Sequence, residues 1–161
     1  MEKVIIVDLD YCIGCRSCET ACAARFFEER RIRYGLLSSS SGLVEETITP
    51  LPCRHCEDAL CLKACPFNVI RKDEKGVVFQ SSFECVGCSS CILACPFGVI
   101  SGNLLRHISQ KCDLCRDRKE GPRCVASCVS GALKYVEEKE IPKEKIGVRF
   151  ISHSPYWRRV K

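Results

Sequence analysis

Short apolar runs separated by polar turns make up most of this chain. Val4–Val7 predicts a strand near the N-terminus, and Lys134–Val136 predicts a final strand. Between them, the apolar residues 69–70 and 77–79 flank a charged turn at 71–76, which is the pattern of a β-hairpin.

One longer segment, residues 17–31, predicts a helix with a charged face turned to solvent. Residues 43–49 predict a further strand, which Pro50 and Pro52 are expected to end because proline lacks a backbone amide donor. The serine run at 38–42 indicates a loop. Together these patterns predict an α+β fold with short elements and many loops.

Sixteen cysteines interrupt this pattern, in four groups of four. The groups are Cys12, Cys15, Cys18, Cys22; Cys53, Cys56, Cys61, Cys65; Cys85, Cys88, Cys91, Cys95; and Cys112, Cys115, Cys124, Cys128. The first and third have the spacing C-x2-C-x2-C-x3-C, which suits a cubane iron–sulfur cluster, and the second and fourth lengthen one gap. Four thiolates per cluster predict four 4Fe–4S clusters, and hence a protein that carries electrons.

Two other uses of cysteine compete with this interpretation. Structural zinc also takes C-x2-C pairs, but a zinc site normally joins two separated pairs around one ion. Three cysteines at successive short spacings suit three corners of a cubane better. Disulfides need an oxidising compartment, and the run Val4–Val7 is too short for the core of a secretory signal. We therefore expect a soluble chain with free thiols in a reducing cytoplasm.

The composition agrees with an interior that a cofactor partly fills. Hydrophobic residues make up 46%, and cysteine supplies about 10% of the chain, so the ordinary apolar fraction is about 36%. That is low for one core, so folding should depend on cluster insertion. Counting about −2 for each oxidised cluster brings the formal charge of +5 to about −3, so the basic balance does not indicate nucleic-acid binding. No stretch approaches about 18 apolar residues, so no membrane span is expected.

Residues beside the cysteines also bear on the expected site. Gly14 and Gly87 precede the second cysteines of groups one and three, where a glycine lets the backbone fold closely around cluster sulfurs. Pro66 and Pro96 follow the last cysteines of groups two and three and should prevent a helix from continuing. His55 lies inside a C-x2-C loop, where we expect a hydrogen bond near the cluster rather than ligation of iron.

The motifs that identify a family are residues 6–15, residues 53–58 with Cys61, Cys65 and Pro66, and residues 111–115 with Gly121, Cys124 and Cys128. With them the chain resembles, over roughly residues 4–136, the four-cluster electron-transfer subunits of molybdenum and tungsten pterin enzymes. Formate dehydrogenase, dimethyl sulfoxide reductase and polysulfide reductase have such subunits. The same subunit type serves carbon monoxide dehydrogenase, formate hydrogenlyase and some aldehyde:ferredoxin oxidoreductases.

The resemblance implies that group one shares ligands with group four, and group two with group three. The implied outer sets are Cys12, Cys15, Cys18 with Cys128, and Cys112, Cys115, Cys124 with Cys22. The implied inner sets are Cys53, Cys56, Cys61 with Cys95, and Cys85, Cys88, Cys91 with Cys65. Pairing of group one with group two stays open as an alternative, although 30 residues separate Cys22 from Cys53 and only 19 separate Cys65 from Cys85.

The implied fold has two bacterial-ferredoxin-like modules, each for two 4Fe–4S clusters, with one nested in the other. The inner module would span about residues 50–105, and the outer module 1–49 plus 106–140, followed by a tail at 141–161. Cations around group four, including Lys111, lead to the hypothesis that this end of the electron path has a higher potential. The aromatic and basic residues 151–161 are a candidate docking segment.

The expected function is electron transfer without catalysis, because no catalytic set, phosphate loop or ligand-deficient metal site stands out. Single electrons would pass between a catalytic subunit, with a molybdo- or tungstopterin enzyme favoured, and ferredoxin or another carrier. Alternatives are a free polyferredoxin, and a subunit of a hydrogenase or carbon monoxide dehydrogenase. From other classes, an iron–sulfur assembly or redox-sensing protein and a zinc-bound interaction module remain open.

Overall fold

The computed structural model describes residues 3–8, 11–25, 32–37, 47–81, 83–103 and 108–141. In chain order the elements are β1 (Lys3–Val7), α1 (Ser17–Arg25), β2 (Arg33–Leu37), β3 (Thr47–Leu51), α2 (Leu60–Lys63), β4 (Ile70–Lys72), β5 (Val78–Gln80), α3 (Ser90–Ala94), β6 (Ser101–Asn103), β7 (Ile108–Gln110), α4 (Arg123–Ala126), β8 (Leu133–Glu137) and a 3-10 turn (Glu138–Glu140). Short helices and short strands are thus mixed along the chain, as the sequence predicts.

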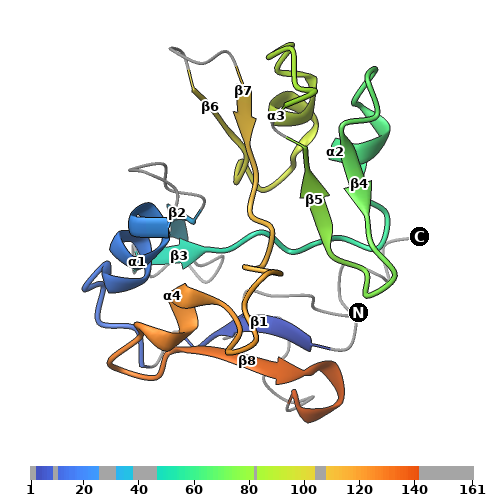
Figure 1. Ribbon diagram of the computed structural model, residues 1–161. Coiled ribbons are helices and arrows are strands. Elements are labelled where there is room, and N and C mark those ends of the chain that lie inside the picture. Colours follow the sequence, from blue (N-terminus) through green and yellow to red (C-terminus); the bar gives the residue numbers. More distant parts are fainter. Residues whose placement is uncertain are drawn as a thin grey trace.

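The described strands form four separate two-stranded antiparallel ribbons, β1–β8, β2–β3, β4–β5 and β6–β7. In Figure 1 the β4–β5 and β6–β7 ribbons lie in the upper half with α2 and α3, whereas β1, β8, α1 and α4 lie in the lower half. The chain therefore starts in the lower half, builds the upper half and returns through β7. The β1–β8 ribbon, which pairs Val7 with Leu133, places the first cysteine group beside the last.

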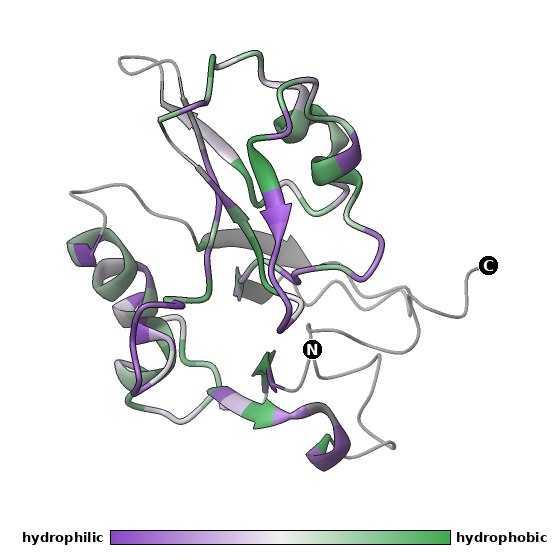
Figure 2. Cartoon of the chain, turned by 45° about the vertical axis from the view of Figure 1, so that its right-hand side comes forward, coloured by the Kyte–Doolittle hydropathy of each residue, from purple (hydrophilic) through white to green (hydrophobic). Residues whose placement is uncertain are grey.

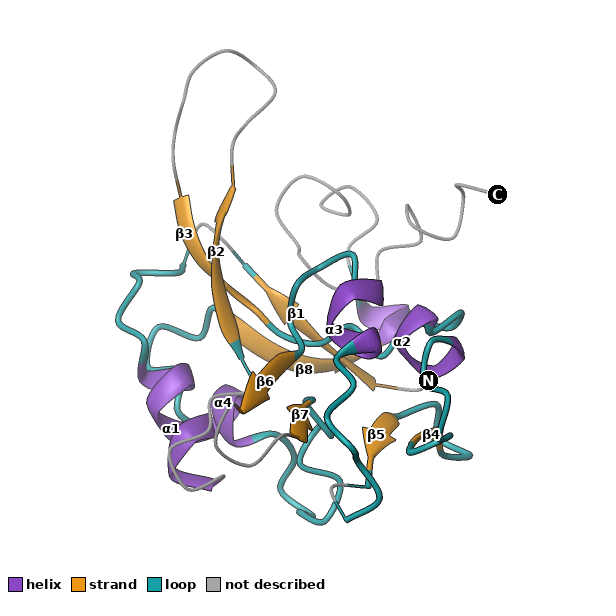
Figure 3. Cartoon of the chain, turned by 90° about the horizontal axis from the view of Figure 1, so that it is seen from above, coloured by secondary structure: helices purple, strands orange, loops and turns teal. Residues whose placement is uncertain are grey.

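Each half has an apolar core of its own, and cysteines belong to both. The buried residues of the lower core are Ile5, Val7, Cys18, Ile32, Val77, Leu114 and Leu133. Those of the upper core are Ala59, Cys65, Val69, Ile70, Val78, Cys91 and Ile100. The helices also pair within the halves, since α1 contacts α4 and α2 contacts α3, and Figure 3 shows both pairs side by side. These two cores are small, so thiols supply an unusual share of the interior.

Hydrophobic and hydrophilic residues alternate over short distances in this fold. In Figure 2 the green stretches are brief and are separated by purple and white ones. Within the residues that the structure describes, no helix combines the length and the apolar character needed to cross a membrane.

Several predicted elements are confirmed. The N-terminal strand is β1, the last strand is β8, and the predicted hairpin is β4–β5. The hairpin strands begin one residue later than predicted, at Ile70 and Val78, and Asp73 closes the turn by accepting the Val77 amide at 2.8 Å. The predicted helix begins at Ser17 and is described as far as Arg25. Residues 26–31, the loop at 38–42 and the tail at 151–161 lie outside the described residues.

One prediction was wrong, and two ribbons were not predicted. Pro50 does not end the third strand but lies inside β3, opposite Tyr34 of β2. Proline is tolerated there because every strand of a two-stranded ribbon is an edge strand, with one side free of ladder hydrogen bonds. Neither β2 nor the β6–β7 ribbon was predicted. The β6 sequence Ser101-Gly102-Asn103 lacks the alternation that identifies a strand.

Candidate functional site

Four cavities are each lined by four cysteines, and together they include all sixteen. They contain Cys12, Cys15, Cys18 and Cys128; Cys112, Cys115, Cys124 and Cys22; Cys53, Cys56, Cys61 and Cys95; and Cys85, Cys88, Cys91 and Cys65. We name them the Cys12, Cys112, Cys53 and Cys85 cavities. No cysteine forms a disulfide. Each cavity takes three cysteines from one group and the fourth from another group in the same half of the molecule.

The first two cysteines of every group lie on a loop with the same unusual backbone turn. The residue before the second cysteine has a positive φ in all four groups: Gly14 (67°), His55 (46°), Gly87 (72°) and Leu114 (60°). A positive φ is uncommon for His and Leu, and such strained residues gather at functional sites. The two glycines were expected at this turn, whereas His55 and Leu114 adopt it without the freedom of glycine.

The third cysteine of every group is the second residue of a helix: Cys18 in α1, Cys61 in α2, Cys91 in α3 and Cys124 in α4. Backbone amides at a helix start favour negative charge, but burial outweighs this effect at Cys61, Cys91 and Cys124 and raises the pKa of these thiols. Four sequence repeats therefore produce four similar half-sites, each a turn followed by a helix start.

The fourth cysteine follows its helix in three groups but lies inside α1 in the first. Helices α2 and α3 end before Pro66 and Pro96, as expected. Helix α4 also ends before its last cysteine although Val129 stands in place of proline, so proline is not required for this stop. Because Cys18 and Cys22 both lie on α1 but line different cavities, this helix joins the Cys12 and Cys112 cavities.

Burial determines how readily the thiols ionise. Burial raises the pKa of Cys61 to about 11 and that of Cys124 to about 12, and it also raises the pKa of Cys112. Hydrogen bonding to Ser17 lowers the pKa of the exposed Cys15, and Ser90 does the same for the exposed Cys88. The interior thiolates therefore need a positive group in the cavity to offset their desolvation.

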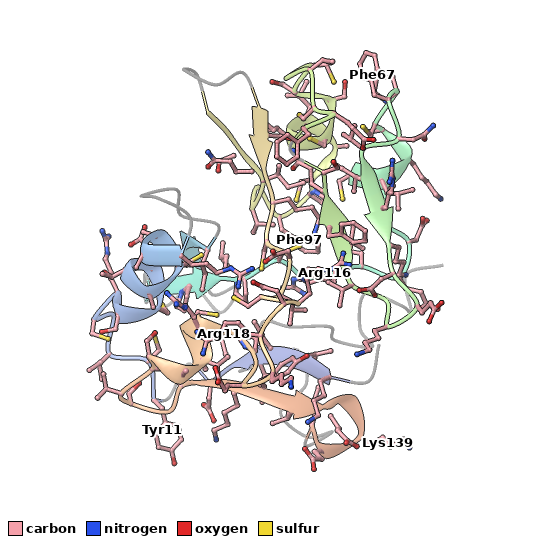
Figure 4. All side chains as sticks on the ribbon, in the orientation of Figure 1. Tyr11, Phe67, Phe97, Arg116, Arg118 and Lys139 are labelled. Atoms are coloured by element: carbon pink, nitrogen blue, oxygen red, sulfur yellow. The ribbon has the colours of Figure 1, made fainter. Side chains whose placement is uncertain are left out.

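The Cys12 and Cys85 cavities each contain a thiol that is exposed to solvent, Cys15 in the first and Cys88 in the second. Apolar side chains at their rims are exposed, namely Ile13 (72%) at the first and Val86 (56%) and Phe67 (54%) at the second. Figure 4 places Phe67 at one end of the molecule and Tyr11, the neighbour of Cys12, at the opposite end. None of the cysteines that line the Cys53 and Cys112 cavities is exposed.

Two buried polar side chains, His55 and Lys111, line the Cys53 cavity. The His55 Nδ1 accepts the Val78 amide at 3.1 Å, so the expected hydrogen bond of this histidine is confirmed. The Lys111 Nζ lies 3.2 Å from the Cys53 Sγ. Sequence reasoning placed Lys111 in a charged loop and missed its burial, because its contacts come from residues distant in the chain.

The segment that carries the fourth cysteine group is fixed by ion pairs to α1 and by a ring contact to the upper half of the molecule. Arg25 of α1 pairs with Asp113 at 3.2 Å and also with Asp117, which ties α1 to the loop after Cys112. The Arg116 guanidinium lies 3.8 Å from the centre of the Phe79 ring of β5. Figure 4 shows Arg116 between the upper and lower halves.

A wide cleft beside this contact is lined mainly by charged residues. Its described cations are Lys3, Arg71, Lys72, Lys75, Arg116, Arg118 and Lys119, and its described carboxylates are Asp73, Glu74 and Glu120. Cys115, which also lines the Cys112 cavity, lies on the cleft wall. The cleft is therefore a positively charged surface next to one of the cysteine sets.

The cysteine sets fit iron–sulfur clusters in number and type, since a 4Fe–4S cluster takes four thiolates. The part of the chain that the structure describes contains no group of three or more His, Cys, Asp or Glu residues arranged to hold a single metal ion. When bound, 4Fe–4S clusters accept and release one electron at a time.

Comparison with known proteins agrees with this chemistry. Residues 44–138 match the family described as the 4Fe-4S dicluster domain. YsaA of Escherichia coli strain K12 is 36% identical over 153 residues, which cover 91% of this chain and 97% of YsaA. The electron transport protein HydN of the same strain is 33% identical over 169 residues (88% of this chain, 91% of HydN). The thiosulfate reductase electron transfer subunit PhsB of Salmonella typhi is 32% identical over 154 residues (88% and 80%). The chain therefore belongs to the 4Fe-4S dicluster domain family, as an iron–sulfur protein of electron transport.

Proposed function

We propose that this chain is a non-catalytic subunit that relays single electrons through four 4Fe–4S clusters. They would pass between a catalytic oxidoreductase subunit, with a molybdo- or tungstopterin enzyme favoured, and ferredoxin or another carrier. The observation that carries the proposal is the presence of four cavities with four cysteines each. Each complete set leaves no ligand position for a substrate, which supports a role without catalysis.

The cavities also support the crossed ligand sets and the nested modules as part of this proposal. The Cys53 and Cys85 cavities would form the inner module, at about 50–105, and the Cys12 and Cys112 cavities the outer one, at 1–49 plus 106–140. Pairing of β1 with β8 supports this division because it joins the two separated segments of the outer module. The upper core supports it too, since all its buried residues lie within 50–105, and the lower core draws on both outer segments, with Val77 as its one buried residue from the inner segment.

The arrangement of the cavities favours one order for the electron path. The Cys12 and Cys85 cavities contain the exposed thiols Cys15 and Cys88, and Tyr11 and Phe67 beside them lie at opposite ends of the molecule (Figure 4), so these two sites would exchange electrons with partners. Helix α1 joins the Cys12 and Cys112 cavities, and Lys111 contacts residues of both the Cys112 and the Cys53 cavity. The order would therefore be Cys12, Cys112, Cys53 and Cys85, in either direction.

The name of PhsB describes an electron transfer subunit of thiosulfate reductase, and this supports a catalytic partner for the present chain. Sixteen free cysteines support a reducing compartment, which we take to be the cytoplasm. The docking role of residues 151–161 stays a prediction, because that segment lies outside the described residues.

Purified under anaerobic conditions, the chain is expected to carry about 16 iron atoms and to take up about four electrons from dithionite, one per cluster. Iron analysis and a coulometric titration followed by EPR measure both numbers. Co-purification of the chain with a catalytic subunit, followed by transfer of substrate electrons to ferredoxin, tests the subunit role. About eight iron atoms would contradict four clusters, and one tightly bound zinc per cysteine set would contradict the cluster chemistry altogether.

The basic cleft reaches Cys115 of the Cys112 set and would therefore be a further place of electron exchange besides the two ends. Its charge supports an acidic carrier such as ferredoxin as the partner there, because opposite charge speeds association. Changing Lys75 and Lys119 together to Glu should slow reduction of an acidic ferredoxin about tenfold at low ionic strength. The effect should shrink near physiological salt, where the Debye length is about 8 Å. Stopped-flow kinetics at several salt concentrations measure this. Lys139→Glu changes an exposed lysine outside the cleft and is the control; equal slowing by this variant would refute the assignment.

A further inference from the structure

Lys111 is a fully buried cation at the crossing between the two halves. It directly follows β7, where the chain leaves the upper half and enters the fourth cysteine group (Figure 1). Its relative exposure is 1%, lower than that of any other charged residue in the part of the chain that the structure describes. Lysine is almost never fully buried unless it is paired, so its burial requires specific partners.

The partners of Lys111 come from both central cavities. Its Nζ donates to the Cys53 Sγ at 3.2 Å, to the Val78 carbonyl at 2.5 Å and to the Cys112 carbonyl at 3.1 Å. Cys53 lines one central cavity and Cys112 the other. The three donors of the ammonium group thus have three acceptors, one of which is a candidate ligand sulfur.

A second buried group holds this arrangement in place. The carbonyl of Val78 accepts from Lys111, while the amide of Val78 donates to the His55 Nδ1 at 3.1 Å. His55 is 2% exposed and lies two residues after Cys53. Val78, at 0% exposure, is therefore fixed between the histidine and the lysine, and the ammonium cannot move away from Cys53 without leaving a buried carbonyl unsatisfied.

We infer that the Lys111 ammonium raises the reduction potentials of the two central clusters, with the larger effect on the cluster bound by Cys53. The inference rests on the ligand sets proposed above. One electron from the donor adds one negative charge to a site, and no covalent bond forms or breaks. A fixed positive charge at hydrogen-bonding distance from a ligand sulfur, shielded from water, stabilises that added charge. Hydrogen bonds to cluster sulfurs act in the same direction.

This role differs from the sequence-based hypothesis of a charged loop around the fourth group. Arg116 and Lys119 are exposed and screened by solvent, whereas Lys111 acts from inside and on two sites at once. A raised potential at both central sites would hold transferred electrons at the crossing between the modules. Lys111 therefore acts by setting the reduction potentials of the clusters and does not itself react.

The test compares Lys111→Met and Lys111→Gln, which remove the charge, with Lys111→Arg, which keeps it. Lys139→Met is the matched control because it removes one exposed lysine far from the crossing (Figure 4). All variants are titrated anaerobically with EPR detection, and iron is counted in each. In the two neutral variants the reduced-to-oxidised ratio of the cluster bound by Cys53 should fall about tenfold at a fixed potential, about 59 mV for one electron, and that of the cluster bound by Cys112 should fall by less. The other two clusters should not change.

Lys111→Arg should restore much of the shift, and Lys139→Met should leave all four potentials unchanged. The inference is overturned if no cluster shifts, if all four shift alike, or if the control variant shifts the same pair. It is also overturned if both neutral variants lose iron while Lys111→Arg keeps it, since Lys111 would then serve assembly rather than potential. An iron count of the unmodified protein below about 16 would instead contradict the proposed ligand sets, so the two failures are distinguishable.

Discussion

Replacing Cys53 and Cys95 together by alanine should remove one cluster, whereas replacing Cys85 and Cys95 together should remove two. The reason is that Cys95 lines the cavity of Cys53 and not that of its own group. Both double variants lose two thiols, so they are matched for the damage done to the upper half. Consecutive ligand sets predict the reverse result, because Cys85 and Cys95 would then belong to one cluster.

Iron analysis and EPR of the reduced proteins measure the difference. The first variant should lose up to about four iron atoms and the second up to about eight, since each cubane contains four. A Cys12→Ala and Cys128→Ala pair should behave like the first variant, because these residues share the Cys12 cavity although most of the chain separates them. Equal losses from the two upper-half variants would refute the crossed sets.

Removal of iron should unfold the chain, and this is the largest effect on stability that the structure predicts. The described sheets are ribbons of two strands, and such ribbons are marginal without additional packing. Cysteines complete both cores, and burial raises the pKa of interior thiols such as Cys124, so ionised thiols are not tolerated there without metal. Structural zinc contributes about 10–16 kcal/mol in zinc-finger peptides, and this range overlaps the total stability of about 5–15 kcal/mol that is usual for a protein, so metal binding can decide whether a small domain folds.

The apoprotein, prepared with a chelator under reducing conditions, should lack a cooperative thermal transition and should exchange its backbone amides rapidly. Near-UV circular dichroism and hydrogen exchange measure these properties. Anaerobic reconstitution with iron and sulfide should restore both signals, which controls for chemical damage. A cooperative transition of the apoprotein close to that of the holoprotein would show that the two apolar cores are sufficient on their own.

Much of the local structure follows from short stretches of sequence. The apolar run at residues 4–7 is sufficient to predict β1, and the charged turn at 71–76 identifies the β4–β5 hairpin. Strands in which apolar and polar residues do not alternate cannot be predicted in this way, and the β6 sequence Ser101-Gly102-Asn103 is an example. Pro50 was misjudged because its tolerance depends on β3 lying at an edge, which is a property of the sheet and not of the residue.

The candidate site also has one part that could be predicted from local sequence and another that could not. Spacing alone identifies the sixteen cysteines as candidate cluster ligands, because each half-site is local. It consists of a C-x2-C turn followed by a helix whose second residue is the next cysteine. The positive φ of His55 and Leu114 could not be read from residue type, since neither favours that conformation. The sequence signal available for this conformation was position: His55 and Leu114 stand directly before the second cysteine, as Gly14 and Gly87 do in the other two groups.

Which half-sites face one another is decided by the tertiary structure: cysteine spacing leaves the pairing open, and at the level of sequence it was implied only by the family resemblance. Pairing of β1 with β8 and contact of α1 with α4 bring Cys128 to the Cys12 cavity and Cys22 to the Cys112 cavity. Lys111 likewise makes its buried hydrogen bonds to residues 33 and 58 positions away, Val78 and Cys53. Cysteine spacing encodes the chemistry of each half-site because ligand geometry is short-range. The pairing of half-sites, and the burial of a charge between them, arise only when distant segments pack together.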